Sequence, residues 1–493
     1  MNATQLLSPY FPNLPLPETP ICRLTEQAQN ADASSLFFCI CGARFDGHDF
    51  ANRAYAQGCR LFIVQKEIAL PDDATVLMVS DTRKMLALLA RDFYGTPDQK
   101  MHLIGITGTK GKTTTAQLLT HILNRSSIAC GYIGTNGISY AGRQYSTANT
   151  TPDAITLQAT LRDMYEHGIK AAVIEVSSQA LMQYRVEGMH FETVLFTNLS
   201  PDHIGINEHP SFAHYQASKK RLFTDFTAKN AIFNLDDPAC KEIIAGTTAT
   251  HLIACSAEAT DADYHVSDVR LLRTNTLLGV GFAINNTTST HHCRLGLTGK
   301  FNAQNALLAI ATAESVFGIR LSDAAESLAD ASVCGRSEII PLPNGATAVI
   351  DYAHNGISLS NLLQTLREYN PYRLITLFGS VGGRTQQRRA ELGEVAASLC
   401  DLAILTSDNP DTESPEDIIA DIARAFYGKS TPYIALPDRE AAIKKAVDLT
   451  QSGDILVLAG KGHENYQLID GKKIPFCEMD ILLNIINLYQ NQS

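Results

Sequence analysis

The sequence lacks several features that mark whole classes of protein. It has no unbroken apolar run of about 18 residues, so we expect no membrane-spanning helix and no membrane insertion. Its first ten residues show neither the charged nor the apolar region of a signal peptide. The 11 cysteines include no CxxC pair, which favours structural thiols in a reducing compartment. We therefore predict a cytoplasmic protein. The closest two thiols, Cys39 and Cys41, fall in an expected strand over 36–41, where alternation places them on one face.

Basic residues are also in short supply. Lys and Arg total 40 against 51 Asp and Glu, and the formal net charge is −11. A surface of that sign argues against nucleic acid as a partner, although local basic pockets for phosphates remain compatible with it. A chain of 493 residues is too long for one hydrophobic core, so roughly three domains are expected.

A glycine-rich stretch at 101–120 organises the rest of the chain. Apolar residues of a buried strand lead into a turn from Gly105 to Gly111, and apolar residues with helical spacing follow it. Strand, glycine turn, Lys-Thr and helix is the arrangement that binds a nucleoside triphosphate. Lys112 would reach the outer phosphates and the Thr113 hydroxyl would bind Mg²⁺. The two glycines enclose five residues where the strict motif has four, so a loop that is glycine-rich by chance stays the alternative.

Short apolar runs then alternate with helical patterns to the end of the chain. This alternation predicts parallel sheets with crossover helices, and the polar residues that follow the runs mark the strand ends where ligands bind. In the middle third, Glu175 is placed to hold a metal near the nucleotide; the alternative is a surface carboxylate. His203 taken alone is equally well explained as a loop histidine. In the last third, four polar runs follow four strands, at 351–354, 379–384, 407–410 and 460–464.

We predict an α/β protein with three domains. A smaller N-terminal α/β domain covers 1–98 and ends at a Gly-Thr-Pro breaker. A central P-loop-type domain with a parallel sheet and helices covers 99–333, and a Rossmann-like C-terminal α/β domain covers 334–493. The glycines at 379–383 lack GxGxxG spacing, so a dinucleotide site is not expected there. A helix is predicted from Pro415 to Phe426, with proline and acidic residues in its first turn.

In their order along the chain, the motifs resemble those of the Mur ligases of peptidoglycan synthesis, and specifically the MurE type that adds the third peptide residue. The resemblance extends over nearly the whole chain. The matching runs are GTKGKTT (108–114), NTTPD (149–153), EVSSQ (175–179), TNL with DH (197–203), YQASK (215–219), NLDD (234–237), GKFN (299–302), GRSE (335–338) and DYAH (351–354). Each run is weak or moderate alone, and their shared order makes the resemblance specific.

The resemblance implies an ATP-dependent ligase with ATP and Mg²⁺ as cofactors. In this family ATP phosphorylates a substrate carboxylate, and an amine then attacks the acyl phosphate and expels phosphate. The implied partners are UDP-MurNAc-L-Ala-D-Glu and a diamino acid, with the enzyme as a monomer. Such an enzyme needs positioning and charge neutralisation more than a nucleophile of its own.

The resemblance also assigns site residues. The catalytic set is Lys112, Glu175, His203 and a carbamylated Lys219, and the metal ligands are Thr113, Glu175, His203 and Lys219. The ATP contacts are Gly108, Thr109, Lys110, Gly111, Lys112, Thr113, Thr114, Asn302, Arg336, Asp351 and His354. The contacts to the muramoyl dipeptide are Asp46, His48, Asn149, Thr150, Thr151, Ser177, Gln179 and Arg185. The contacts to the amino acid are Arg384, Asp408, Asn409, Asp411, Gly460 and Glu464. Carbamylation would turn the Lys219 amine into the anionic oxygen ligand that Mg²⁺ prefers.

The sequence departs from the family pattern at two informative places. Where the family has Asp-Ser-Arg before its first long strand, this chain has Gln27, Ala28 and Gln29. Family members that add meso-diaminopimelate have DNPR, whose Arg binds the distal carboxylate of the amino acid; here Asp411 replaces that Arg. An Asp repels a distal carboxylate and attracts a distal ammonium, each effect being worth about 1–3 kcal/mol when desolvated.

From Asp411 we predict L-lysine as the added amino acid, with L-ornithine next and meso-diaminopimelate as an alternative. The competing interpretation is that Asp411 points into solvent and selectivity lies elsewhere. Two further hypotheses stay open. One is folylpolyglutamate synthetase, which shares the nucleotide domain and the chemistry. The other is a catalytically silent paralogue that binds the cell-wall precursor, although the intact Lys112, Glu175 and Lys219 weigh against it.

Overall fold

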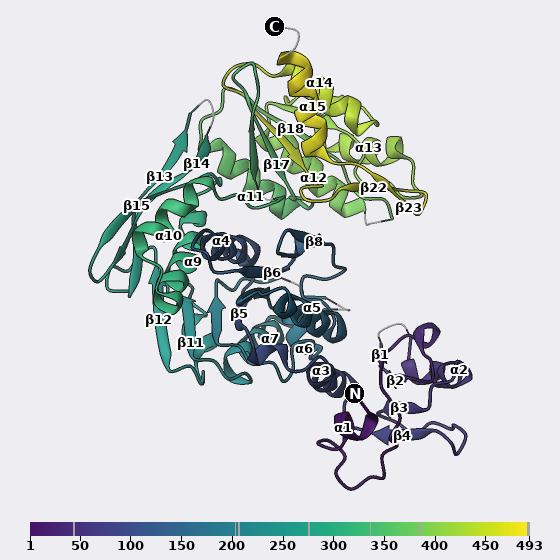
Figure 1. Ribbon diagram of the computed structural model, residues 1–493. Helices are drawn as coiled ribbons and strands as arrows, with labels where there is room; N and C mark the ends of the chain where they lie inside the picture. The colour runs from purple at the N-terminus through teal and green to yellow at the C-terminus, as the bar shows by residue number, and fades with distance from the viewer. Residues whose placement is uncertain are drawn as a thin grey trace. The chain divides into compact units, whose positions relative to one another are not determined.

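The computed structural model describes residues 1–42, 45–202, 204–205, 208–274, 277–335, 337–383 and 386–490. It shows the three α/β domains that the sequence predicts (Figure 1). The chain divides into two compact units, Met1–Asp263 with Ala311–Gly318, and Tyr264–Ile310 with Ile319–Ser493. The predicted boundaries at 98 and 333 stay predictions. Within the described ranges, no helix has the length and apolar character needed to cross a membrane.

The N-terminal sheet is parallel throughout, in the order β1-β2-β3-β4. Its elements are α1 (Ala3–Leu7), β1 (Arg23–Thr25), β2 (Ser35–Phe38), α2 (Ala51–Ala56), β3 (Leu61–Val64), β4 (Thr75–Met78) and α3 (Thr82–Phe93). The expected strand over 36–41 is too long: β2 ends at Phe38, although Cys39 N–H still donates to Ile63 O, and Ile40 O accepts from Gly47 N–H. The prediction that Cys39 and Cys41 share a strand face is therefore wrong: Cys39 is buried and Cys41 is exposed.

The central sheet of the first unit runs in the order β12-β11-β10-β5-β9-β6-β7-β8. Its parallel strands are β5 (His102–Thr107), β6 (Cys130–Gly134), β9 (Ala171–Glu175), β10 (Thr193–Phe196), β11 (Asn230–Asn234) and β12 (His251–Ser256), and the antiparallel pair β7 (Gly137–Tyr140) and β8 (Arg143–Tyr145) extends one edge. The helices are α4 (Lys112–Arg125), α5 (Ala154–Glu166), α6 (Ser178–Met182), α7 (Phe212–Thr224) and α8 (Cys240–Ile244). Because β5 and β9 are neighbours, the loops that follow them meet at one edge of the sheet.

The second unit begins with three antiparallel strands, β13 (Tyr264–Arg273), β14 (Leu278–Asn286) and β15 (Thr290–Leu295). Two helices follow, α9 (Phe301–Phe317) and α10 (Leu321–Ser327). The last turns of α9 belong to the first unit. The C-terminal sheet has the order β16-β17-β21-β18-β19-β20, in which only the β16–β17 pair is antiparallel. Its strands are β16 (Glu338–Pro341), β17 (Thr347–Asp351), β18 (Leu374–Phe378), β19 (Leu402–Leu405), β20 (Tyr433–Ala435) and β21 (Ile455–Ala459). Its helices are α11 (Gly356–Arg367), α12 (Gln386–Leu399), α13 (Pro415–Ala423), α14 (Arg439–Leu449) and α15 (Glu478–Gln490), with a hairpin of β22 (Tyr466–Ile469) and β23 (Lys472–Pro475).

Alternation along the C-terminal strands builds two apolar layers. Val349 and Val457 pack with α11, α12 and α13 on one face, whereas Ile350 and Leu456 pack with α14 and α15 on the other. A parallel sheet that is covered on both faces leaves its strand ends as the places where polar side chains gather. The helix predicted over 415–426 ends at Ala423 and continues as a 3₁₀ turn over Arg424–Phe426.

Candidate active site

The loop between β5 and α4 has the geometry of a phosphate loop. Gly108 and Gly111 have φ angles of 149° and 81°, which favour glycine. A Cβ on Gly108 would also overlap the side chain of Thr197, so the close approach of these two segments needs glycine there. Helix α4 begins at Lys112, and the backbone N–H groups of its first turn form an anion-binding helix start. The extra residue in the motif therefore leaves the strand–loop–helix arrangement intact.

Two lysines converge on this loop. Lys112 Nζ donates to Gly108 O at 2.8 Å and to Thr109 O at 3.0 Å. Lys219 Nζ, from α7, donates to the same Gly108 oxygen at 2.7 Å and lies 4.5 Å from the centre of the Tyr215 ring. Lys219 is only 1% exposed, and its burial, reinforced by the charge of Lys112, lowers its pKa well below the usual value. The amine of Lys219 is thereby biased toward its neutral form.

Glu175 lies at the end of β9 among hydroxyl groups, and it is fully buried. Thr113 Oγ1 donates to Glu175 Oε2 at 3.0 Å, and Tyr132 OH donates to Oε1 at 2.5 Å. Thr135 adds its N–H to Oε1 at 3.1 Å and its hydroxyl to Oε2 at 3.3 Å. The alternative that Glu175 is a surface carboxylate is therefore wrong. A carboxylate beside a threonine hydroxyl is an all-oxygen donor set of the kind that Mg²⁺ prefers, so the residues present fit this ion.

Part of the set assigned to the muramoyl dipeptide also meets at the end of β9. Thr151 Oγ1 donates to Glu175 O at 2.7 Å and accepts from Ser177 N–H at 3.0 Å, and Arg185 Nη1 donates to Thr151 O at 2.7 Å. Thr150 Oγ1 lies 3.1 Å from Thr135 Oγ1. Ser177 also caps α6, which carries Gln179. Asn149 lines a cavity of about 550 Å³ between the β7–β8 hairpin and α5, together with Tyr140, Tyr145, Asp153, Thr156 and Asp163.

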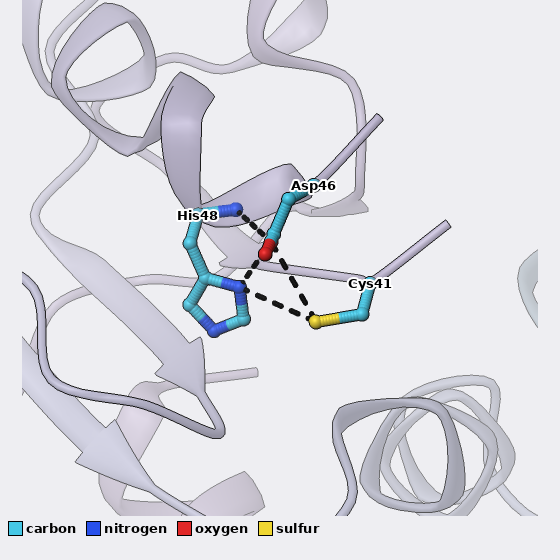
Figure 2. A group of neighbouring side chains, drawn as sticks. All are labelled: Cys41, Asp46 and His48. Carbon is cyan, nitrogen blue, oxygen red and sulfur yellow. Dashed lines mark hydrogen bonds and ion pairs between the residues drawn. The ribbon is translucent and has the colours of Figure 1, made fainter. Parts of the chain in front are cut away.

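Asp46 and His48 form a hydrogen-bonded group with Cys41 in the N-terminal domain. Figure 2 shows the three side chains pointing toward one another. His48 Nδ1 lies 2.6 Å from Asp46 Oδ1, and Cys41 Sγ lies 3.6 Å from that oxygen and 3.8 Å from Nδ1. Lys66 Nζ donates to Asp46 Oδ2 at 2.6 Å, and this bond is the largest cause that lowers the pKa of Asp46.

The spacing of Cys41, Asp46 and His48 suits a metal ion, but the histidine tautomer does not. Gln65 N–H donates to His48 Nε2 at 3.1 Å, so that nitrogen accepts and Nδ1 carries the proton that it donates to Asp46. A metal at Nδ1 would move the ring proton to Nε2, where it would face another N–H donor, whereas metal-binding histidines donate from their second nitrogen. We therefore interpret the group as a hydrogen-bond network that fixes His48, which is buried.

In the second unit, three residues assigned to the amino acid surround a lysine that the sequence interpretation missed. Lys461 Nζ donates to Asn409 Oδ1 at 2.9 Å and to Glu464 Oε2 at 3.0 Å, and it lies 3.4 Å from Asp408 Oδ1. Asn409 Nδ2 also donates to Glu464 Oε2 at 3.0 Å. A Cβ on Gly460 would lie 2.9 Å from Asp408 Oδ2. Asp408, Asn409, Gly460 and Glu464 thus form one cluster, at the ends of β19 and β21.

Asp411 stands apart from that cluster. Its φ angle is 53°, and its Oδ1 accepts from Gly471 N–H at 2.8 Å. Its own N–H donates to Leu468 O at 2.9 Å, and its carbonyl accepts from Asp470 N–H at 2.9 Å. The carboxylate of Asp411 therefore holds the turn of the β22–β23 hairpin rather than pointing freely into solvent.

The remaining residues assigned to ATP lie in the second unit. Asn302 Nδ2 donates to Thr298 O at 2.8 Å and its Oδ1 accepts from Asn305 Nδ2 at 2.8 Å. Asp351 Oδ2 accepts from Ser337 N–H at 2.8 Å, and His354 Nδ1 lies 2.9 Å from Tyr352 O. His203, Arg336 and Arg384 fall outside the described residues.

Sequence interpretation also missed Tyr132 and Thr135, which bind Glu175. The apolar run at 130–134 is too short to predict a strand. No sequence pattern near it indicates a contact with Glu175. Lys461 had a usable signal, because it stands between Gly460 and Glu464 in a polar run that follows a predicted strand.

Known proteins that resemble this chain in sequence are Mur ligases, as the motifs and the phosphate loop predict. Three family models match: the Mur ligase family catalytic domain at 28–94, the Mur ligase middle domain at 106–313, and the Mur ligase glutamate ligase domain at 335–462. A UDP-N-acetylmuramoyl-L-alanyl-D-glutamate--2,6-diaminopimelate ligase from Aquifex aeolicus (strain VF5) is 38% identical over 464 residues, 94% of this chain and 93% of that protein. The protein of the same name from Geobacillus kaustophilus (strain HTA426) is 35% identical over 464 residues, 92% and 93% of the two chains.

Among solved structures, a ligase with the same name has a TM-score of 0.73 at 27% identity and covers 99% of both chains. These matches favour a Mur ligase over folylpolyglutamate synthetase, because relatives with muramoyl names are 35% and 38% identical over more than nine-tenths of this chain. The chain therefore belongs to the Mur ligases, in the MurE group, and is an ATP-dependent ligase that forms an amide bond in peptidoglycan synthesis.

Proposed function

We propose that this protein joins a diamino acid to the D-Glu residue of UDP-MurNAc-L-Ala-D-Glu and converts ATP to ADP and phosphate. The convergence of Lys112, Thr113, Glu175 and Lys219 on the loop at Gly108 is the observation that carries the proposal. The names of relatives that match over nine-tenths of the chain support the choice of substrates. The monomeric state and the cytoplasmic location stay predictions.

The residues around the loop supply positive charge where phosphoryl transfer requires it. Lys112 and the N–H groups at the start of α4 would bind the phosphate oxygens of ATP. Thr113 and Glu175 would hold Mg²⁺, which neutralises phosphate charge when bound. Thr151 and Arg185, next to Glu175, would position the dipeptide so that its D-Glu carboxylate accepts the phosphoryl group. The acyl phosphate then reacts with the amine of the diamino acid, the C–N bond forms, and phosphate leaves.

Lys219 has two properties that suit carbamylation. Its pKa is lowered, chiefly by burial, so more of the amine is neutral and able to react with carbon dioxide. Its nitrogen also lies against the loop that would hold the phosphates. As a carbamate it would present an anionic oxygen to a cation, whereas an ammonium would repel one.

Two candidates compete for the amino acid. The names of the relatives favour meso-diaminopimelate, which we take as the first candidate acceptor. The carboxylate of Asp411 favours L-lysine, because it would repel a distal carboxylate and attract a distal ammonium. The hydrogen bond from Gly471 N–H gives Asp411 a structural role in the hairpin, so its presence is explained without a role in selectivity. The carboxylate still carries a negative charge that could act on the amino acid.

The proposed function is tested by mass analysis of the nucleotide product after incubation with ATP, Mg²⁺, UDP-MurNAc-L-Ala-D-Glu and a diamino acid. We expect UDP-MurNAc-tripeptide and ADP in equal amounts, and neither when the dipeptide is omitted. The Lys112→Met variant is the control for loop-dependent turnover. ADP without tripeptide would indicate a plain NTPase, and no ADP with any diamino acid would favour the silent paralogue.

A further inference from the structure

Tyr132 makes a contact to Glu175 that no assigned role explains. It is 2% exposed, lies on β6, and places its hydroxyl oxygen 2.5 Å from Glu175 Oε1 on the neighbouring strand β9. The same hydroxyl accepts from Asn136 N–H at 3.2 Å. Because an ionised carboxylate only accepts hydrogen bonds, the Tyr132 hydroxyl is the donor to Glu175.

The two oxygens of Glu175 have different surroundings. Oε1 receives the Tyr132 hydroxyl and Thr135 N–H, both from β6 or the turn that follows it. Oε2 faces the hydroxyl of Thr113 at the start of α4, 3.0 Å away, and accepts from the Thr135 hydroxyl at 3.3 Å. The β6 side therefore makes its two shorter hydrogen bonds to Oε1 and a longer one to Oε2, the oxygen that lies beside the phosphate loop.

We infer that Tyr132 is a positioning residue for the metal site: with Thr135 N–H it holds Oε1, so that Oε2 and the Thr113 hydroxyl together face a divalent cation. The inference rests on the proposed function, because it takes Glu175 and Thr113 as ligands. Groups that orient a metal-binding carboxylate by hydrogen bonds typically change metal affinity 10- to 100-fold when they are removed.

Gly134 supports the same arrangement independently. A Cβ on this residue would overlap both Glu175 Oε1 and the hydroxyl of Tyr132. The strand thus has glycine at a position where a side chain would push the tyrosine and the carboxylate apart. Its φ angle is not positive, so backbone conformation does not require glycine there.

The test compares Tyr132→Phe with a matched control, Tyr140→Phe. Tyr140 lies on the adjacent strand β7, and its hydroxyl likewise donates to a carboxylate, that of Asp163. Mn²⁺ binding to the protein with ADP is measured by the paramagnetic signal of the free ion, with Glu175→Gln showing which binding belongs to this site. We expect Tyr132→Phe to weaken Mn²⁺ binding about 10-fold and Tyr140→Phe to leave it within about twofold of wild type.

A second readout separates positioning from a merely structural role. In turnover assays the Mg²⁺ concentration for half-maximal rate should rise about 10-fold in Tyr132→Phe, while kcat at saturating Mg²⁺ stays within about threefold. Gly134→Ala should shift the Mg²⁺ requirement in the same direction. If Tyr132→Phe has the same Mn²⁺ affinity and the same Mg²⁺ requirement as the wild-type protein, the inference is wrong, and the proposed function is unaffected. Wild-type protein without ATP turnover, or with Mn²⁺ binding no tighter than that of Glu175→Gln, would overturn the metal assignment itself.

Discussion

Lys219 on α7 donates a hydrogen bond to the carbonyl oxygen of Gly108, at a distance of 2.7 Å. The two residues are 111 positions apart in sequence. The bond fixes a buried amine against the loop that we propose binds the nucleotide, and Lys112 bonds to the same oxygen. Lysine nitrogens this close to each other repel, which is one reason why the pKa of Lys219 is lowered after the larger effect of burial.

Replacing Lys219 with Ala should lower kcat at least about 100-fold, because it removes the precursor of the proposed anionic ligand. Acetate should restore part of the activity by supplying a carboxylate in the vacated space. Lys220→Ala is the matched control, since Lys220 is the next residue on α7 and is only partly buried; it should remain active. Full activity of Lys219→Ala without acetate would contradict the carbamate proposal.

Asp411→Asn tests the acceptor argument more cleanly than Asp411→Arg. Asn keeps an oxygen for Gly471 N–H and tolerates the φ of 53°, so it removes the charge without disturbing the hairpin. If the charge sets selectivity, the ratio of kcat/KM for L-lysine over meso-diaminopimelate should fall about 10-fold. Asp470→Asn, on the same hairpin turn, is the control. An unchanged ratio in Asp411→Asn would place selectivity elsewhere.

Lys461→Met should raise the KM for the amino acid about 10-fold while the KM for ATP stays within about twofold. The lysine bridges Asn409 and Glu464, which are partly buried. Its loss would leave Asn409 Oδ1 with the hydrogen bond from Leu468 N–H and Glu464 Oε2 with the one from Asn409 Nδ2, so both side chains would be held less firmly. Steady-state kinetics with each substrate varied in turn measures the difference. Lys472→Met, on the exposed strand β23, is the comparison variant. An equal rise in both KM values would argue for a general structural defect.

The buried ion pair of Arg439 and Glu478 contacts the ends of β19 and β21, the strands that precede the cluster of Asp408 and Glu464. Arg439 donates to Glu478 Oε1, and also to Ser407 O and Ala459 O, at 2.9 Å each. Both side chains are fully buried. Arg439→Met should lower the free energy of unfolding by about 3–5 kcal/mol, because it leaves a buried carboxylate without its partner. The exposed ion pair Arg320–Asp323 provides the control. Measured by urea denaturation, Arg320→Met should lower the free energy of unfolding by less than about 1 kcal/mol. Similar losses in the two variants would refute the special role of Arg439.

Burial raises the pKa of Glu478 above its ordinary value of 4.5 despite the opposing charge of Arg439. The folded state therefore binds this proton more tightly than the unfolded state. Its contribution to the free energy of unfolding is full below pH 4.5 and is lost as the pH rises through the folded pKa. Glu478→Gln should remove that part of the pH dependence, measured as urea midpoints between about pH 4 and 8. Identical pH dependence in wild type and variant would show that Glu478 does not titrate as proposed.

Local signals account for much of what could be predicted. Glycine spacing and a helical pattern identify the loop before Lys112, and buried runs gave the strands that end near Glu175 and Asp408. The three antiparallel strands from Tyr264 to Leu295 escaped prediction, although burial alternates along β15 and along the first half of β13. Strand β14 lacks that signal, because it is buried along most of its length.

The contacts that complete the site depend on which strands become neighbours, and no local pattern contains that information. Tyr132 reaches Glu175 only because β6 pairs with β9. Asp411 could be read from sequence as a charge, but its φ and its bond to Gly471 arise from the hairpin that folds against it. Motif order suggested which residues to assign to the site, whereas the hydrogen-bond partners of those residues required the structure.

The proposed ligase releases phosphate only when both the muramoyl dipeptide and a diamino acid are present. The most direct measurement is phosphate release with ATP, Mg²⁺ and UDP-MurNAc-L-Ala-D-Glu, adding meso-diaminopimelate, L-lysine or L-ornithine in turn. We expect phosphate release that depends on the dipeptide and is fastest with meso-diaminopimelate. Release with L-lysine alone would keep the ligase and assign selectivity to Asp411. No phosphate release with any of the three amino acids, or release without the dipeptide, would contradict the proposed ligase activity.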